Sequence, residues 1–259
     1  MAETKRVIID AGHGGADPGA VYMGRLEKDD NLALALTVGQ ILADHEIDVS
    51  FTRVTDVYQS PLAKAEMANR WNADYFVSIH RNAMERPGTA SGFQSLIYES
   101  GGEAEKLAKN IQAALHALGE PELGIVERPG LIVLRRTEMP AVLVEAGFLD
   151  NEADNQFFDA SFDEIAQSIA QGIMKTIRDA QEDPGYYQIQ VGAFADRAQA
   201  ERLLGELIGQ GLPAFLVYQD GLYKVRVGAY LSLDYAAWTE RTLRGAGYET
   251  ILVQEAAVL

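Results

Sequence analysis

Two histidines and two glutamates occupy positions from which side chains could meet and do chemistry. His13 follows the apolar run VII and lies between glycines in VIIDAGHGG, and His80 closes a second apolar run, YFVSIH. Glu145 closes a third run, AVLVE, and Glu27 stands just before a predicted helix. Two imidazoles and one carboxylate form a known ligand set for catalytic zinc, which leaves a fourth position for water. Because the chain has no cysteine, any metal site must use histidine and carboxylate ligands.

The chemistry that such a site could perform is hydrolysis. Zinc polarises a carbonyl group and lowers the pKa of a water molecule toward about 7. A further carboxylate must then take the proton from water and pass it to the leaving amine, and Glu145 fits that role by position. Asp10 either holds a ligand imidazole in place through a hydrogen bond or caps the turn that follows it. Glu27 is either a ligand or an acid favoured by the dipole of the helix start.

The elements that must position these residues belong to a mostly parallel sheet with helices around it. Residues 7–9 form an unbroken β-branched run, which is typical of a strand buried on both faces of a parallel sheet. The glycines around His13 then allow a tight turn at the carboxyl end of the strand, where open α/β sheets place ligands. Residues 75–80 repeat this pattern, so we expect His13 and His80 to converge at one edge of the sheet.

Hydrophobic periodicity and turn chemistry predict the remaining elements of residues 1–181. His45 and His116 are expected at the surface. Helices are predicted from Asp29 or Asp30 to about Ala43 and over residues 61–71, 103–118 and 162–179. Strands are predicted over residues 49–53, 75–80, 95–98 and 141–144, with a short strand at LIVLR, residues 131–135, and a polar segment at 151–156.

A short polar break, EDPG at residues 182–185, separates this domain from a smaller one at residues 186–259. The smaller domain contains an internal repeat, YQIQVGAF followed later by YKVRVGAY, and each copy precedes a helix and a further strand. The pattern predicts a βαββαβ fold of the α+β class, with an antiparallel sheet and two helices on one face. The other face of that sheet would be open to a ligand.

Composition and charge limit the kinds of partner and the location that we expect for this chain. The 259 residues carry a formal net charge of −16, which argues against a nucleic-acid partner bound through a general basic surface. The start, MAETKRVIID, has no apolar core of a signal peptide, so no signal peptide is expected. No apolar run approaches the ~20 residues that span a bilayer, so no membrane insertion is expected.

Four blocks of the sequence together resemble one enzyme family. VIIDAGHGGADPGA, EKDDNLALA, VSIHRNA and MPAVLVEAGFLDN are similar, in this order, to the zinc-dependent N-acetylmuramoyl-L-alanine amidases of bacterial cell-wall lysis. The resemblance implies a Zn²⁺ ion bound by His13, Glu27 and His80, with Glu145 as the catalytic acid or base. It also implies hydrolysis of the amide between the lactyl group of N-acetylmuramic acid and L-alanine of the peptidoglycan stem peptide.

Some positions depart from the family pattern or add to it. Arg81 stands where a small residue is usual, and Ala146 where valine or asparagine is common, but neither change removes a predicted ligand. The segment between Asn82 and Gly92 is short, whereas some family members carry an inhibitory helix there. We assign Asn82 to substrate binding. Arg135 is assigned to a carboxylate of the stem peptide, with a pair to a surface acid as the alternative.

The C-terminal repeat resembles the sporulation-related repeat domain, a peptidoglycan-binding module that recognises denuded glycan strands, from which the stem peptides have been removed. Gln190 and Arg226 stand at matching positions of the two copies and are predicted to bind glycan through hydrogen bonds. Phe194 and Tyr230 either stack on sugar rings or belong to the core, and Trp238 is expected in the core.

Two alternatives to the amidase remain open at this point. The chain could be a zinc peptidase that cuts within the stem peptide, or a non-catalytic peptidoglycan-binding protein. The latter should lack a ligand or the catalytic glutamate, and this sequence lacks neither. For localisation we expect a cytoplasmic protein of a mother cell, one released to the cell wall on lysis, or a secreted protein if a signal was trimmed.

Overall fold

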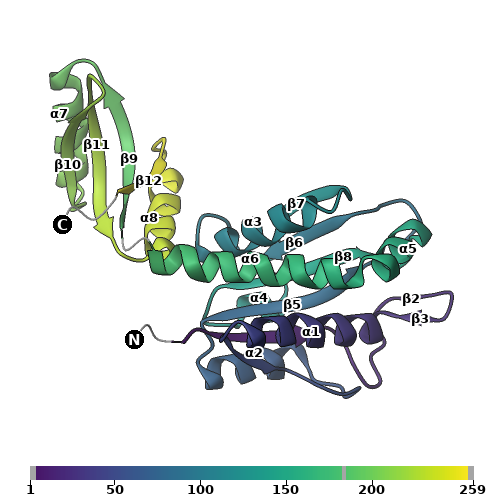
Figure 1. Cartoon of the computed structure of the whole chain (residues 1–259). Coiled ribbons are helices and arrows are strands. Elements are labelled where there is room, and N and C mark those ends of the chain that lie inside the picture. The colour runs from purple at the N-terminus through teal and green to yellow at the C-terminus, as the bar shows by residue number, and fades with distance from the viewer. Residues whose placement is uncertain (1–3, 183–184, 256–259) are drawn as a thin grey trace. The chain divides into compact units, whose positions relative to one another are not determined.

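A computed structural model describes residues 4–182 and 185–255 of the chain, apart from the side chain of Glu182. The chain divides into two compact units (Figure 1). The first unit comprises residues 1–100 and 104–178, and the second comprises residues 101–103 and 179–259. Each unit has its own sheet and its own core.

The first unit is built on a six-stranded sheet in the order β4-β1-β5-β8-β6-β7. Its strands are β1 (Arg6–Ala11), β4 (Asp48–Phe51), β5 (Tyr75–Asn82), β6 (Phe93–Ile97), β7 (Glu122–Glu127) and β8 (Ala141–Phe148). Neighbouring strands run parallel except β6 and β8, which are antiparallel. The predicted mostly parallel sheet is therefore confirmed.

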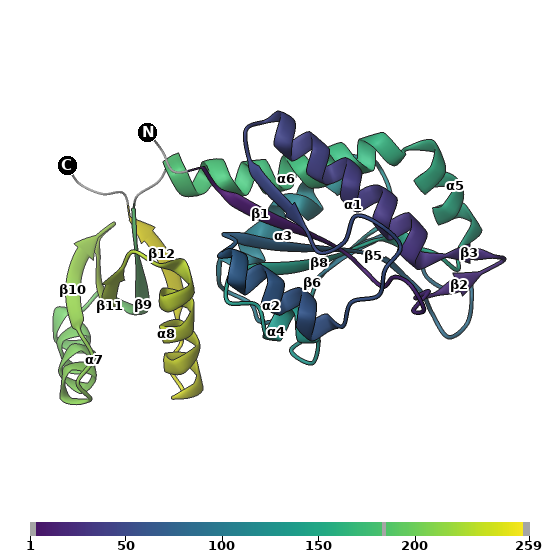
Figure 2. The ribbon, with the colours of Figure 1, turned by 90° about the horizontal axis from the view of Figure 1, so that it is seen from below.

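Helices cover both faces of this sheet, as Figure 2 shows. The helices are α1 (Glu27–Asp44), α2 (Pro61–Trp71), α3 (Glu103–His116), α4 (Ile132–Arg135), α5 (Glu152–Ala160) and α6 (Phe162–Glu182). A short hairpin of β2 (Val21–Tyr22) and β3 (Arg25–Leu26) precedes α1. Residues of α1, α3 and α6 share one apolar core, and residues of α2 and α4 share the other.

Alternation along the strands explains why both faces are covered. Successive side chains of a strand point to opposite faces. Val7 and Ile9 accordingly pack into the core under α1, α3 and α6, while Ile8 packs into the core with α2 and α4. All three side chains are fully buried. An apolar run without polar alternation therefore predicts a central strand of a three-layer fold.

One prediction for the first unit is wrong. Residues 131–135 form the helix α4 rather than a strand, and the preceding residues form the strand β7. A short apolar run does not distinguish a strand from a buried helix, and packing of Val133 and Leu134 against α2 decides for the helix. The polar segment at 151–156 leads into α5, because Asn151 caps that helix through the backbone amides of Ala153 and Asp154.

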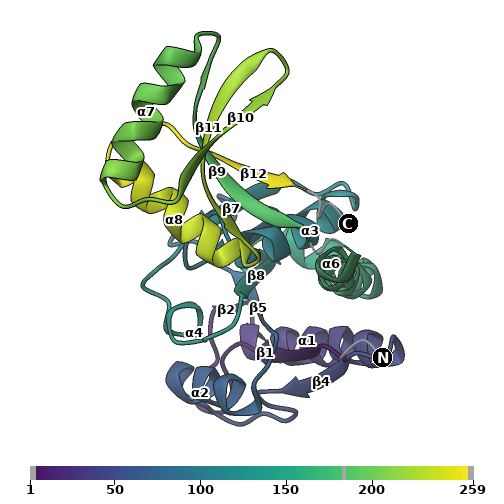
Figure 3. The ribbon, with the colours of Figure 1, turned by 90° about the vertical axis from the view of Figure 1, so that its left-hand side faces the viewer.

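The second unit is an antiparallel sheet in the order β10-β11-β9-β12, with α7 and α8 on one side of it (Figure 3). Its elements are β9 (Tyr186–Phe194), α7 (Arg197–Gly209), β10 (Ala214–Gln219), β11 (Leu222–Tyr230), α8 (Leu233–Gly245) and β12 (Ile251–Glu255). Ile189, Val191, Val225 and Val227 form the core beneath the helices. The predicted βαββαβ order and antiparallel sheet are confirmed.

The repeated Gly-Ala-aromatic segments have a packing explanation. Phe194 and Tyr230 pack against the core of this unit. A Cβ on Gly228 would lie 2.2 Å from Tyr230, and a Cβ on Gly192 would lie 2.6 Å from Phe194, so each ring covers its glycine. The structure therefore supports a core role for Phe194 and Tyr230 rather than stacking on sugar rings.

Trp238 is 54% exposed and stacks on Tyr235 at 5.6 Å between ring centroids, so its predicted place in the core is wrong. The buried apolar residues of α8 are Ala236, Ala237 and Leu243. In the described residues, no helix combines the length and the apolar character that crossing a membrane requires.

Candidate metal centre

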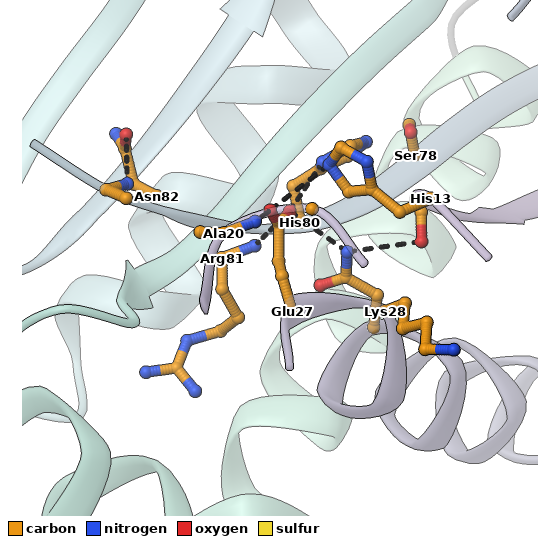
Figure 4. A network of polar contacts seen from close by, with 12 residues as sticks. His13, Ala20, Glu27, Lys28, Ser78, His80, Arg81 and Asn82 are labelled. Carbon is orange, nitrogen blue, oxygen red and sulfur yellow. Dashed lines mark hydrogen bonds and ion pairs between the residues drawn. The ribbon is translucent and has the colours of Figure 1, made fainter. Parts of the chain in front are cut away.

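Three predicted site residues meet near the carboxyl ends of β1 and β5 in the six-stranded sheet: His13, Glu27 and His80. His13 Nε2 lies 3.1 Å from Glu27 Oε2, and His80 Nδ1 lies 2.8 Å from Glu27 Oε1. One ligand atom from each residue can be chosen so that all lie within 4.8 Å of one another. Figure 4 shows the two imidazoles and the carboxylate pointing toward one another. The convergence expected from the strand ends is present.

Glycines make this convergence possible. A Cβ on Gly12 would lie 2.3 Å from the ring of His80, and a Cβ on Gly19 would lie 2.5 Å from Glu27 Oε2. Gly19 also has a φ of 67°, which glycine adopts without strain. His13 itself has a φ of 59°, so its backbone turns sharply as it leaves β1. The glycine-rich turn therefore brings two strand ends closer than side chains would allow.

Glu27 is the first residue of α1 rather than a residue before it. Its carboxylate is buried at the positive end of the helix dipole, which favours the charged form. Oε2 accepts a hydrogen bond from the backbone amide of Ala20 at 2.8 Å, and Oε1 accepts one from Asn31 Nδ2 at 3.1 Å. Burial alone would raise the pKa of Glu27, but hydrogen bonds from His13 and His80 outweigh it and lower the pKa.

His13 is oriented by Asp17, a residue that the sequence analysis did not single out. Asp17 Oδ2 lies 2.8 Å from His13 Nδ1, which leaves Nε2 directed at Glu27. Burial alone would lower the pKa of His13, but Glu27 and Asp17 raise it from 6.5 to about 9. The available signal was the spacing, because Asp17 follows His13 by four residues within the DPG turn.

Among the described residues, Asp10 neither contacts an imidazole nor caps the turn, so neither of its two predicted roles is observed. Its carboxylate is buried and accepts hydrogen bonds from Thr52 Oγ1 and Ser78 Oγ, each at 2.6 Å. Lys64 Nζ lies 2.8 Å from Asp10 Oδ1 and donates to the carbonyl of Ala11 at 2.7 Å. This buried ion pair ties the end of β1 to α2 beneath the His13 turn.

Glu145 lies directly beside the three clustered residues. It pairs in register with His80 on the neighbouring strand. Glu145 Oε2 is buried and has no hydrogen-bond partner within the described residues. Burial raises the pKa of Glu145 from 4.5 to about 7. A carboxyl group with a pKa near neutrality can accept and donate a proton at neutral pH, as a general acid–base requires.

Asn82 and Glu145 line the same cavity, of about 370 Å³. Arg128, which the sequence analysis did not single out, lines it as well. Arg135 lies on α4, is exposed, and is not among the described residues that line this cavity.

Arg81 points away from the clustered imidazoles (Figure 4). Its guanidinium is buried, with Asp30 Oδ2 at 2.7 Å and Asn155 Oδ1 at 2.8 Å, and it lies 4.0 Å from the centre of the Phe158 ring. The departure from a small residue therefore adds a brace between β5, α1 and α5.

In the second unit, Gln190 and Arg226 are paired in register on adjacent strands. The guanidinium of Arg226 is buried and donates to Gln188, Gln219 and Glu255. Arg226 therefore links its own strand, β11, to the three other strands of the sheet through side-chain hydrogen bonds. Gln190 remains half-buried.

The residues at the first site fit a zinc ion. Two imidazole nitrogens and a carboxylate are a donor set of catalytic zinc. Asp17 supplies the outer hydrogen bond that a ligating histidine usually makes. The buried, unpartnered Oε2 of Glu145 leaves a hydrogen-bond acceptor beside the cluster. The arrangement suits hydrolysis of a carbonyl substrate.

Comparison with known proteins agrees with this geometry. Residues 7–175 match the family model described as N-acetylmuramoyl-L-alanine amidase. The chain belongs to this family. Residues 183–254 of the amidase match the SPOR domain model. It is therefore an N-acetylmuramoyl-L-alanine amidase that acts on peptidoglycan and carries a SPOR domain.

Named relatives and solved structures are similar over most of the amidase. The sporulation-specific N-acetylmuramoyl-L-alanine amidase of Bacillus subtilis is 34% identical over 83% of this chain and 85% of its own. N-acetylmuramoyl-L-alanine amidase CwlM of Bacillus licheniformis is 32% identical over the same shares. The crystal structure of the Clostridium difficile amidase is 34% identical, with a TM-score of 0.65, and covers 68% of this chain and 97% of its own.

Proposed function

We propose that the amidase is a zinc enzyme in which His13, Glu27 and His80 hold the ion and Glu145 moves the proton. The observation that carries the proposal is the meeting of two imidazoles and a carboxylate with their ligand atoms within 4.8 Å. Zinc held there would polarise the scissile carbonyl and lower the pKa of a water molecule. The bond cut would be the amide between N-acetylmuramic acid and L-alanine.

The chain's own residues divide the remaining work. Glu145 Oε2 is the buried acceptor next to the cluster, so it would take a proton from the attacking water. It would then give that proton to the departing nitrogen of L-alanine, which leaves as an amine. Asp17 and the backbone amide of Ala20 hold His13 and Glu27 in their orientations, so both could bind with little rearrangement.

We further propose that the second unit binds glycan through the sheet face opposite α7 and α8. Ile189 and Val191 pack beneath the helices, so alternation directs Gln190 to the opposite face. Gln190 would donate and accept hydrogen bonds with sugar groups, while Arg226 would shape the face through its own side-chain partners. Denuded glycan strands are the proposed ligand.

The test of the enzyme proposal combines metal analysis with identification of the product. We expect about one zinc ion per chain, loss of cell-wall hydrolysis on chelation, and recovery with added zinc. Digested walls should gain free amino groups on L-alanine. New amino groups on other residues, or undiminished hydrolysis after zinc has been removed, would contradict the proposal.

The glycan proposal is tested with the full chain. Gln190→Ala should reduce co-sedimentation with walls already stripped of stem peptides, while hydrolysis of a soluble muropeptide should be unchanged. Gln210→Ala, on an exposed glutamine at the end of α7, is the matched control. Equal sedimentation of both variants and the unsubstituted protein would exclude Gln190 as a glycan ligand.

A further inference from the structure

The cavity beside Glu145 extends away from the metal ligands, along the end of the sheet. Its lining includes Asn82 from β5, Glu145 from β8, Gln94 from β6 and Arg128, which follows β7. Leu96 and Phe148 contribute apolar walls. A volume of about 370 Å³ lies within the range of small-ligand sites, so the cavity can hold a short peptide.

The chemistry decides which part of the substrate enters this cavity. A general acid must lie within hydrogen-bond reach of the atom that it protonates. Glu145 would protonate the nitrogen of L-alanine, so the leaving peptide has to begin beside Glu145. The cavity that Glu145 lines is the space into which such a peptide can extend.

Arg128 is the one cation among the described residues that line the cavity. Its guanidinium donates to the neighbouring backbone carbonyl of Glu127 at 3.2 Å. In the described part of the chain, no carboxylate forms an ion pair with it. A guanidinium offers a fork of donors that matches a carboxylate, so Arg128 is free to bind one brought by a ligand.

We propose that Arg128 binds a backbone carboxylate of the stem peptide and sets a preference for peptides in which that carboxylate is free. The inference rests on the proposed cleavage of the amide to L-alanine. The lactyl carboxyl of the glycan is consumed in that amide, so the carboxylate must come from the peptide. The nearest candidate belongs to the residue after L-alanine, where a carboxamide would remove the charge.

Two matched substrates test the proposal. N-acetylmuramoyl-L-alanyl-D-isoglutamate and the corresponding isoglutamine compound differ only in a carboxylate against a carboxamide. We expect the unsubstituted enzyme to prefer the carboxylate by about tenfold in kcat/KM, in keeping with a charged hydrogen bond. Arg128→Gln should abolish this preference and keep turnover of the isoglutamine compound, and Arg128→Lys should retain part of the preference.

Binding provides a readout without turnover, and exposed arginines provide controls. The dissociation constants of the two released dipeptides for the metal-free protein should differ in the same direction and become equal in Arg128→Gln. Arg136→Gln, an exposed arginine at the end of α4, should leave the preference unchanged. Loss of the preference in Arg135→Gln instead would overturn the proposal and assign the carboxylate to Arg135.

The outcomes separate this inference from the proposed function. If the enzyme cleaves neither compound between muramic acid and L-alanine, the proposed function fails. If it cleaves both at equal rates, with Arg128→Gln unchanged, the function stands and the inference is overturned.

Discussion

His80 and Glu145 lie side by side in register on the parallel strands β5 and β8. One strand carries a candidate ligand near its carboxyl end and the next carries a candidate proton carrier, so ordinary sheet pairing sets their spacing. Backbone hydrogen bonds of a sheet hold neighbouring strands about 4.8 Å apart. The paired strands therefore form a rigid base for the site. The turn at His13 and the start of α1 at Glu27 bring the other two side chains to it.

Glu145→Gln should abolish hydrolysis while zinc stays bound. The carboxamide keeps the shape of the side chain but cannot carry the proton, so kcat should fall by about 10² to 10⁴. Release of stem peptides and zinc content are the two measurements. Glu138→Gln, on an exposed residue before β8, should behave like the unsubstituted protein. Retained hydrolysis in Glu145→Gln would assign the proton transfer to another group.

Asp17→Asn should weaken zinc binding without unfolding the protein. Asp17 is a surface residue whose carboxylate orients the ring of His13. Loss of such an outer partner typically lowers metal affinity by about 10- to 100-fold. Competition with a chromogenic chelator measures the affinity, and Asp44→Asn at the end of α1 is the control. Equal zinc affinities in all three proteins would show that Asp17 is dispensable.

The buried pair of Asp10 and Lys64 should make the protein sensitive to acid. Burial alone would raise the pKa of Asp10, but Lys64, Ser78 and Thr52 outweigh it and lower the pKa below 3.8. Its contribution to stability is therefore present above pH 3.8 and is lost as the pH falls further.

The test uses the double variant Asp10→Asn/Lys64→Met with a chelator present, which removes the pH dependence of metal binding. Urea unfolding of the unsubstituted protein should lose more free energy between pH 5 and pH 3 than the double variant does. Asp10→Asn alone should cost roughly 3 kcal/mol, because it leaves a buried ammonium group without its counter-charge. Parallel acid profiles of the two proteins would contradict the assignment.

Arg81→Met should destabilise the first unit by roughly 3 kcal/mol, because Asn155 loses its buried donor and the Phe158 ring loses a cation contact. Asp30 keeps Arg25 as a partner at 2.7 Å, so the loss should stay moderate. Lys109→Met, on a 64% exposed lysine of α3, should change stability by no more than about 0.5 kcal/mol. Denaturant unfolding measures both, and equal stabilities would show that Arg81 is not a brace.

Strand ends and glycines in the sequence predict that His13 and His80 converge at one end of the sheet. A buried strand in a parallel sheet reads as an apolar run, and its carboxyl end is where a polar side chain can reach a site. His13 lies just beyond the end of β1, whereas His80 and Glu145 lie within the last four residues of β5 and β8, because both strands continue past the predicted ends. Glu27 begins the helix α1. The fold of the second unit could also be predicted from its repeat, because the alternation of its strands and its turn residues are local signals.

The partners of buried charges could not be predicted from the sequence, because they depend on which distant segments fold together. Lys64 on α2 reaches Asp10 on β1, so Asp10 is held beneath the turn, and Asp17 orients His13 instead. Arg128 lines the cavity because β7 is the edge strand beyond β6, an order that no local pattern encodes. Periodicity reports the face that a residue occupies, whereas the partner of a charge is set by chain segments that meet only on folding.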